Sequence, residues 1–83
     1  GYIQFLKNNF ETAIENFTYA ADNALLAQDT MMYVNANLGL YLSYGSLYSI
    51  YQERDYPVAH ECLNKKIYHY ELVYYDKNIK IGK

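Results

Sequence analysis

Hydrophobic residues recur at intervals of three and four along most of this chain, which is the period of an amphipathic α-helix. The clearest row predicts a helix over residues 10–28, and its members are Phe10, Ala13, Ile14, Phe17, Ala20, Ala21, Ala24, Leu25 and Leu26. Before it, Ile3, Phe5 and Leu6 predict the end of another helix, over residues 1–7. Asn8 and Asn9 are expected to break the two helices apart, because asparagine tolerates left-handed turn geometry.

Two more helices are predicted in the second half of the chain. Asp29 or Thr30 is expected to cap a helix over residues 31–53. Gly39 and Gly45 lie inside that helix, and interior glycines indicate either close helix packing or a kink, so a break at Gly45 stays open. Pro57 predicts the start of a helix over residues 57–75, with Asp55 or Tyr56 at its cap. The tail over residues 76–83 either continues this helix or frays.

Composition narrows the function classes. The 83 residues carry a net charge of −2, with acidic and basic side chains interspersed, and Lys77, Lys80 and Lys83 cluster only at the tail. Nucleic-acid binding is therefore not expected, since it needs a basic face. No apolar run approaches the ~20 residues that span a bilayer, so no membrane partner is expected. Cys62 is the only cysteine, which favours a reducing, intracellular compartment, either cytoplasm or nucleus.

No constellation of residues indicates catalysis, a cofactor or a metal. His60, Cys62 and His69 are the only soft metal ligands, and their spacing does not form the compact set of four that zinc needs. Cys62 and His69 are about 10 Å apart along a helix axis, too far for a nucleophile–base pair. We therefore predict a chain that is not an enzyme and that holds no cofactor or metal.

Two stretches resemble the start of the second helix of a tetratricopeptide repeat. They are Asn9-Phe10-Glu-Thr-Ala13-Ile14-Glu-Asn-Phe17 and Asp55-Tyr56-Pro-Val-Ala59-His60-Glu-Cys-Leu63. In each, an aromatic residue follows a turn, alanine comes three residues later, and a large apolar residue follows four after that, as in the A-x3-F element of the repeat. Leu38-Gly39 resembles the L-G of the first helix. Ala13 and Ala59 are further apart than the standard period of about 34 residues, so the resemblance is to a divergent member.

The resemblance implies an all-α fold of about four helices, arranged as antiparallel pairs of a superhelical array. Residues 1–83 are then one helical segment, expected to be part of a larger array and complex. Such arrays bind other proteins, so the implied function is a scaffold or adaptor for a protein or peptide partner. One alternative is a peptide-sensing regulatory domain. Another is a structural segment of a large assembly, for example a scaffold subunit of the cohesin-loader type.

The first helix of each repeat lines the concave face in such arrays, and this placement selects the candidate partner-binding residues Asn35, Tyr41, Leu42 and Tyr44. Asparagine can bind a peptide backbone with both its donor and its acceptor. The tyrosines at 41, 44, 48 and 51 share one side of a helix. They form either an aromatic groove for a peptide or ordinary helix–helix packing.

Overall fold

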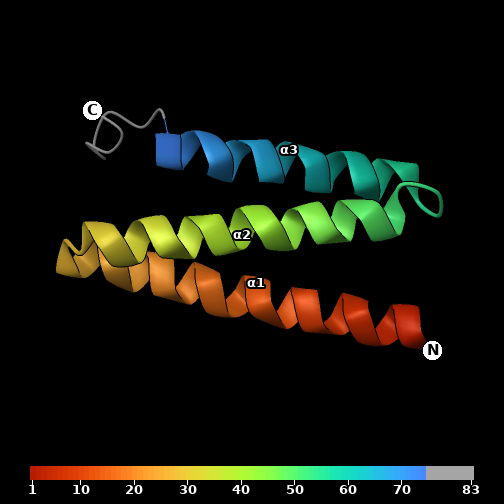
Figure 1. Cartoon of the computed structure of the whole chain (residues 1–83), viewed down its shortest axis with the longest axis horizontal. Helices are drawn as coiled ribbons and strands as arrows, with labels where there is room; N and C mark the ends of the chain where they lie inside the picture. The colour runs from red at the N-terminus through yellow and green to blue at the C-terminus, as the bar shows by residue number, and fades with distance from the viewer. Residues whose placement is uncertain (75–83) are drawn as a thin grey trace.

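Three helices make up the part of the chain that the computed structural model describes, residues 1–74. They are α1 (Tyr2–Ala27), α2 (Thr30–Tyr51) and α3 (Tyr56–Tyr74). α2 lies between α1 and α3, and each helix runs antiparallel to the one before it (Figure 1). The all-α prediction is confirmed for these residues, and the predicted continuation or fraying of the tail lies outside them.

A capped turn joins α1 to α2. Gln28 adopts a left-handed conformation with φ 57°, and its backbone N–H reaches the carbonyls that end α1. The Asp29 carboxylate then accepts a hydrogen bond from the Met32 backbone N–H at 3.0 Å, which satisfies one of the free donors of the new helix. Asp29 is therefore the N-cap, one of the two residues that the sequence indicated.

The second connection, between α2 and α3, also ends on an aspartate. Asp55 accepts a hydrogen bond from the Val58 backbone N–H at 3.4 Å. Pro57 follows Tyr56 in the first turn of α3, where its missing N–H costs nothing. The predicted cap at Asp55 is confirmed, and the helix begins one residue earlier than expected. α2 continues without interruption through Gly45, so the break left open there does not occur.

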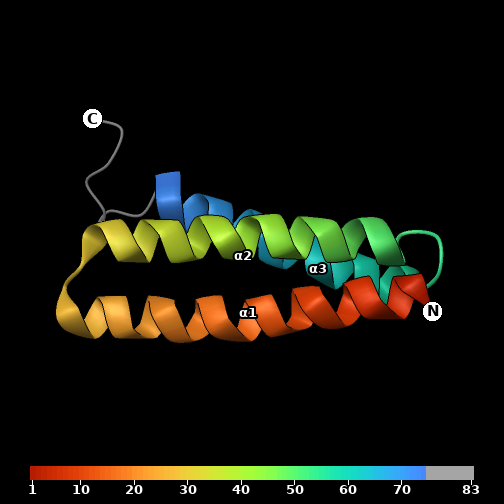
Figure 2. The ribbon, with the colours of Figure 1, turned by 60° about the horizontal axis from the view of Figure 1, so that its bottom comes forward.

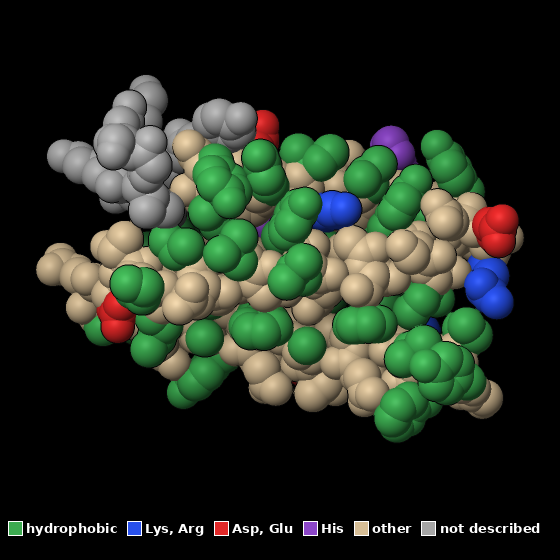
Figure 3. All heavy atoms as spheres, viewed as in Figure 1, with side chains coloured by type: hydrophobic (Ala, Val, Ile, Leu, Met, Phe, Trp, Pro, Cys, Tyr) green, Lys and Arg blue, Asp and Glu red, His purple; other side chains and the backbone are tan. Residues whose placement is uncertain are grey.

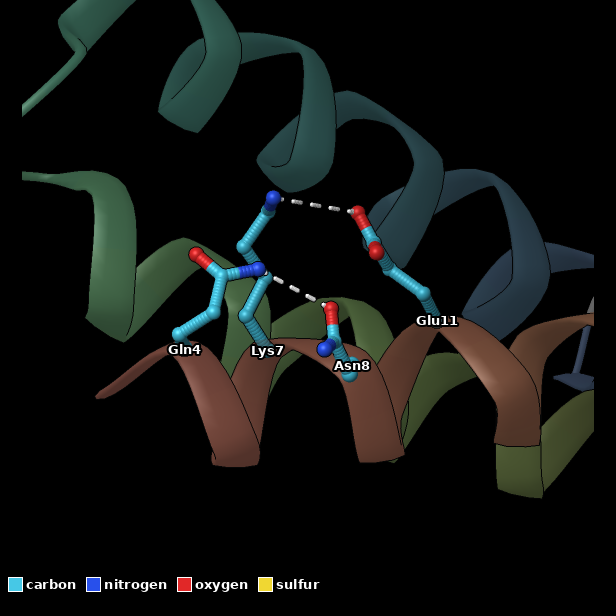
Figure 4. Close-up of polar contacts among 4 residues, drawn as sticks. All are labelled: Gln4, Lys7, Asn8 and Glu11. Atoms are coloured by element: carbon cyan, nitrogen blue, oxygen red, sulfur yellow. Dashed lines mark hydrogen bonds and ion pairs between the residues drawn. The ribbon is translucent and has the colours of Figure 1, made fainter. Parts of the chain in front are cut away.

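The predicted break at Asn8 and Asn9 is wrong, because α1 is continuous from Tyr2 to Ala27. Polar contacts one turn apart span this stretch (Figure 4): Gln4 Nε2 donates to Asn8 Oδ1 at 3.0 Å, and Lys7 pairs with Glu11 at 4.0 Å. Both asparagines are exposed. Their low helix propensity costs only a few tenths of a kcal/mol each. The helices predicted over residues 1–7 and 10–28 are therefore one, and the described chain has three helices instead of four.

The apolar stripe of α1 explains why the helix continues through the asparagines. Leu6, Phe10 and Ile14 follow one another at steps of four and pack against a buried cluster of Leu47, Ile50 and Cys62. A turn at residues 8–9 would take Leu6 out of this row. Figure 2 shows that α2 ends and α3 begins beside the start of α1. Side chains of all three helices therefore meet at this cluster.

A glycine lets α1 and α2 approach closely. The Phe17 ring lies over Gly39, and a Cβ atom added to Gly39 would come within 2.6 Å of it. Close packing therefore explains Gly39, one of the two roles that the sequence left open. Gly45 differs, because a Cβ there would meet only the flexible end of Lys66, at 3.2 Å.

Substituting alanine at the two glycines should shift stability in opposite directions. Alanine favours a helix over glycine by about 1 kcal/mol, so Gly45→Ala should raise the free energy of unfolding by up to that amount. Gly39→Ala gains the same term, but it forces the Phe17 ring to move, and such overpacking costs about 1–3 kcal/mol. Urea unfolding should therefore show that the Gly39→Ala variant is less stable than the wild type. Equal stabilisation by both substitutions would contradict the close approach.

Candidate functional site

The four predicted site residues divide between two surfaces of α2. Asn35 and Leu42 are exposed, and they lie seven residues apart, which places them on one face, two turns from each other. Tyr41 and Leu42 both line a surface hollow of about 280 Å³. Tyr44 belongs to a different environment, because it stacks on His69 and packs against the buried cluster. The structure therefore brings together Tyr41 and Leu42, with Asn35 two turns from Leu42 and Tyr44 turned toward α3.

The hollow is built on α2 and closed by one side chain from α3. Its α2 residues are Tyr41, Leu42, Gly45, Ser46 and Ser49, and its α3 residue is Lys66. The Lys66 ammonium lies 5.2 Å from the centre of the Tyr41 ring, within the range of a cation–π interaction. Gly45 leaves space beneath Lys66, since a side chain there would occupy the hollow.

Aromatic side chains extend this surface along α3. The Tyr41 and Tyr70 rings are 5.5 Å apart, and those of Tyr70 and Tyr74 are 4.7 Å apart. Ile67 lies one helical turn before Tyr70, so it shares their face. We call Tyr41, Leu42, Ile67, Tyr70 and Tyr74, together with Lys66, the outer patch. Figure 3 shows hydrophobic side chains over both α2 and α3 on one face of the molecule, with a basic side chain between them.

The outer patch is apolar and accessible. Leu42 is 65% exposed, Ile67 47% and Tyr74 55%. Such a surface is costly to leave in water unless something covers it.

A buried polar pair joins α2 to α3 beside Tyr44. Asn37 is 1% exposed, and its Nδ2 donates to the Tyr33 backbone carbonyl at 3.0 Å. Its Oδ1 lies 2.8 Å from His69 Nδ1. Because that oxygen can only accept, Nδ1 carries a proton and donates to it. This pair links the two helices and orients the His69 ring against Tyr44.

Burial and a neighbouring charge both act on His69. Burial lowers the pKa of the His69 imidazole from its usual 6.5, and Lys65 lowers it further. The Lys65 ammonium lies 5.8 Å from the centre of the Tyr44 ring on which His69 stacks. The folded chain therefore favours the neutral ring.

The lowered pKa of His69 predicts that the free energy of unfolding decreases in acid. Below about pH 6.5 the unfolded chain takes up a proton at His69 before the folded chain does, so stability falls as the pH falls through the folded-state pKa. Urea midpoints measured from pH 7 downward should decline less steeply for His69→Gln than for the wild type. Parallel declines would contradict the assignment. The comparison with His69→Gln removes the contribution of the carboxylates, which both chains share.

The other reactive side chains do not assemble into a site. Burial raises the pKa of the Cys62 thiol, and the charge of Glu61 raises it further. Lys65 lowers this pKa, and Glu11 raises it by a smaller amount. A raised pKa disfavours the thiolate that acts as a nucleophile. Among residues 1–74, no three His, Cys, Asp or Glu side chains are placed to hold a metal ion. No helix in this part of the chain is long and apolar enough to cross a membrane.

Several residues of the surface were not identified from the sequence. Lys66, Tyr70 and Tyr74 follow one another at steps of four, a spacing that places them in line along α3. The spacing along α3 does not indicate that these residues lie beside Tyr41, because the packing of α2 against α3 is a tertiary contact. The contact between Asn37 and His69 has no signal in sequence either, since 32 positions separate them.

Comparison with models of protein families, with curated proteins and with solved structures gives no match to this chain. The tetratricopeptide resemblance therefore stays a prediction.

Proposed function

We propose that this chain is a non-catalytic scaffold or adaptor, which binds a protein or peptide partner through the outer patch. The observation that carries the proposal is the continuity of this apolar surface across two helices. Leu42 and Tyr41 contribute from α2, and Tyr70, in ring contact with Tyr41, continues the surface on α3. Tyrosine is common among the residues that dominate binding energy at protein interfaces.

The proposal includes the wider arrangement that the resemblance implies. Two antiparallel pairs, α1 with α2 and α2 with α3, are compatible with a segment of a superhelical array, in which a partner lies along successive helices. In this arrangement Asn35 extends the outer patch along α2, two turns from Leu42, and its exposed amide is available to a peptide backbone. Tyr44 contacts α3 by stacking on His69. We place this activity inside the cell, in keeping with the single cysteine.

Site-specific photo-crosslinking tests the proposal. A photoreactive phenylalanine analogue in place of Leu42 should give a discrete adduct with one other protein in cells that express the chain, identified by mass spectrometry. The same analogue at Leu26 is the control. Leu26 is even more exposed, at 85%, but it lies at the end of α1 and outside the outer patch. Adducts from Leu26 alone would contradict the proposal.

The nature of the adduct separates the alternatives. A distinct protein chain supports the scaffold. A short peptide alone would favour the peptide-sensing domain. An adduct formed only within the chain that carries the analogue would favour a structural segment of a large assembly.

A further inference from the structure

We propose that the hollow between Tyr41, Leu42 and Lys66 recognises an acidic segment of a partner protein, in which a carboxylate side chain lies next to a large apolar one. The inference rests on the proposed function and names the chemistry of its partner. Three features of the hollow carry it: its size, the state of the Lys66 ammonium, and the polarity of its rim.

The hollow suits a single side chain. Its volume of about 280 Å³ is at or below the lower limit of the roughly 300–1,000 Å³ that is typical of small-molecule sites. Leu42 and the Tyr41 ring give it apolar walls, and Gly45 lets the end of Lys66 lie close to α2, where an added Cβ atom would meet it at 3.2 Å. An apolar side chain inserted there would cover Leu42, which is otherwise 65% exposed.

The Lys66 ammonium is available to an anion. It is half-buried, its stem lies against Gly45, and its charge lies over the Tyr41 ring. Within residues 1–74, the ion pair at 4.0 Å or less joins Lys7 to Glu11, and no carboxylate lies this close to Lys66. A partner carboxylate would therefore supply a charge-assisted hydrogen bond, about twice as strong as a neutral one.

The rim of the hollow accepts hydrogen bonds and offers few donors. The Ser46 hydroxyl donates to the Leu42 carbonyl at 3.1 Å, and the Ser49 hydroxyl donates to the Gly45 carbonyl at 3.3 Å. Their oxygen lone pairs stay available to accept from backbone N–H groups of a bound segment. Lys66 is the one cation among the residues that line the hollow, so an anion is directed to this position.

The charge of the hollow favours an acidic protein segment over a nucleic acid as its ligand. A nucleic acid would need several basic side chains to neutralise successive phosphates, and the hollow has one lysine. An acidic segment needs only one cation, beside the apolar contact that a nucleic-acid backbone does not provide. The combination of Lys66 with Leu42 and Tyr41 therefore favours a protein segment.

Selection from a random peptide library displayed on phage, with the 83-residue chain as the immobilised target, tests the inference. The selected peptides should carry Asp or Glu beside a large apolar residue. Their Kd, measured by fluorescence anisotropy, should rise about tenfold or more for Lys66→Gln, because the charge-assisted bond is lost. Gly45→Leu, which fills the hollow without changing charge, should weaken binding as strongly. Circular dichroism checks that both variants keep their helices.

Lys65→Gln is the matched control. It removes the same charge from the neighbouring residue, but Lys65 lies over Tyr44 and outside the hollow, so the Kd should change less than about twofold. Selected peptides that bind Lys66→Gln and Gly45→Leu as tightly as they bind the wild type would overturn the inference and leave the proposed function standing. Enrichment of purely apolar or basic peptides would also overturn it. Selection of no peptide would overturn it too, and the crosslinking at Leu42 then decides the proposed function separately.

Discussion

Replacing Leu40 with alanine should lower the free energy of unfolding by about 2–5 kcal/mol, the range for truncating a buried leucine. Leu40 is 2% exposed and is one of the two largest fully buried side chains. Truncation removes its apolar contacts and leaves a cavity. Small domains have little stability in reserve. Thermal and urea unfolding followed by circular dichroism should therefore show a strongly shifted or partly lost transition.

Leu42→Ala is the control for this prediction. The substitution removes the same atoms from the same helix two residues later, but Leu42 is 65% exposed. The free energy of unfolding should change by no more than about 0.5 kcal/mol. Similar losses for the two variants would mean that α2 does not present Leu40 to the core and Leu42 to solvent.

Replacing Asn37 with alanine should cost about 1–3 kcal/mol, the second large effect. Asn37 is 1% exposed and accepts the hydrogen bond from His69 Nδ1 at 2.8 Å. Without it, a half-buried donor on α3 has lost its partner, and the interface between α2 and α3 gains a small cavity. Urea unfolding at pH 7 measures the loss.

Two comparisons isolate the contact from the general effect of the substitution. Asn35→Ala removes the same amide from the exposed face of α2 and should change stability by at most about 0.5 kcal/mol. A double-mutant cycle with Asn37→Ala and His69→Ala should give an interaction energy of about 0.5–3 kcal/mol. An interaction energy of zero would contradict the pairing of these two side chains.

The helical period and the turn residues were enough to place most of the secondary structure. The apolar spacing located α2 and α3, and Asp29 and Asp55 marked their starts, because capping is a local effect of one side chain on its own backbone. Asn8 and Asn9 misled the prediction for α1. Their intrinsic turn preference is a few tenths of a kcal/mol, and burial of Leu6 and Phe10 against the cluster formed with α2 and α3 outweighs it.

The candidate site was predictable only on the helix that carries most of it. The repeat resemblance selected Asn35, Tyr41, Leu42 and Tyr44 on one predicted helix, and the structure brings Tyr41 and Leu42 together at the hollow. Periodicity did not show that Tyr44 turns toward His69, or that Lys66 and Tyr70 complete the surface from α3. These depend on how α2 and α3 pack, which is set by close contacts between residues far apart in the sequence.

The central claim is that the outer patch binds a partner. The most direct test measures how tightly the protein captured by crosslinking at Leu42 binds to a Leu42→Asp variant of the chain. Isothermal titration should show binding at least about tenfold weaker to Leu42→Asp than to the wild type, since a carboxylate would be buried in an apolar interface. Leu26→Asp, with the same change outside the patch, should bind within about twofold of the wild type. Equal affinity of Leu42→Asp and the wild type would contradict the claim.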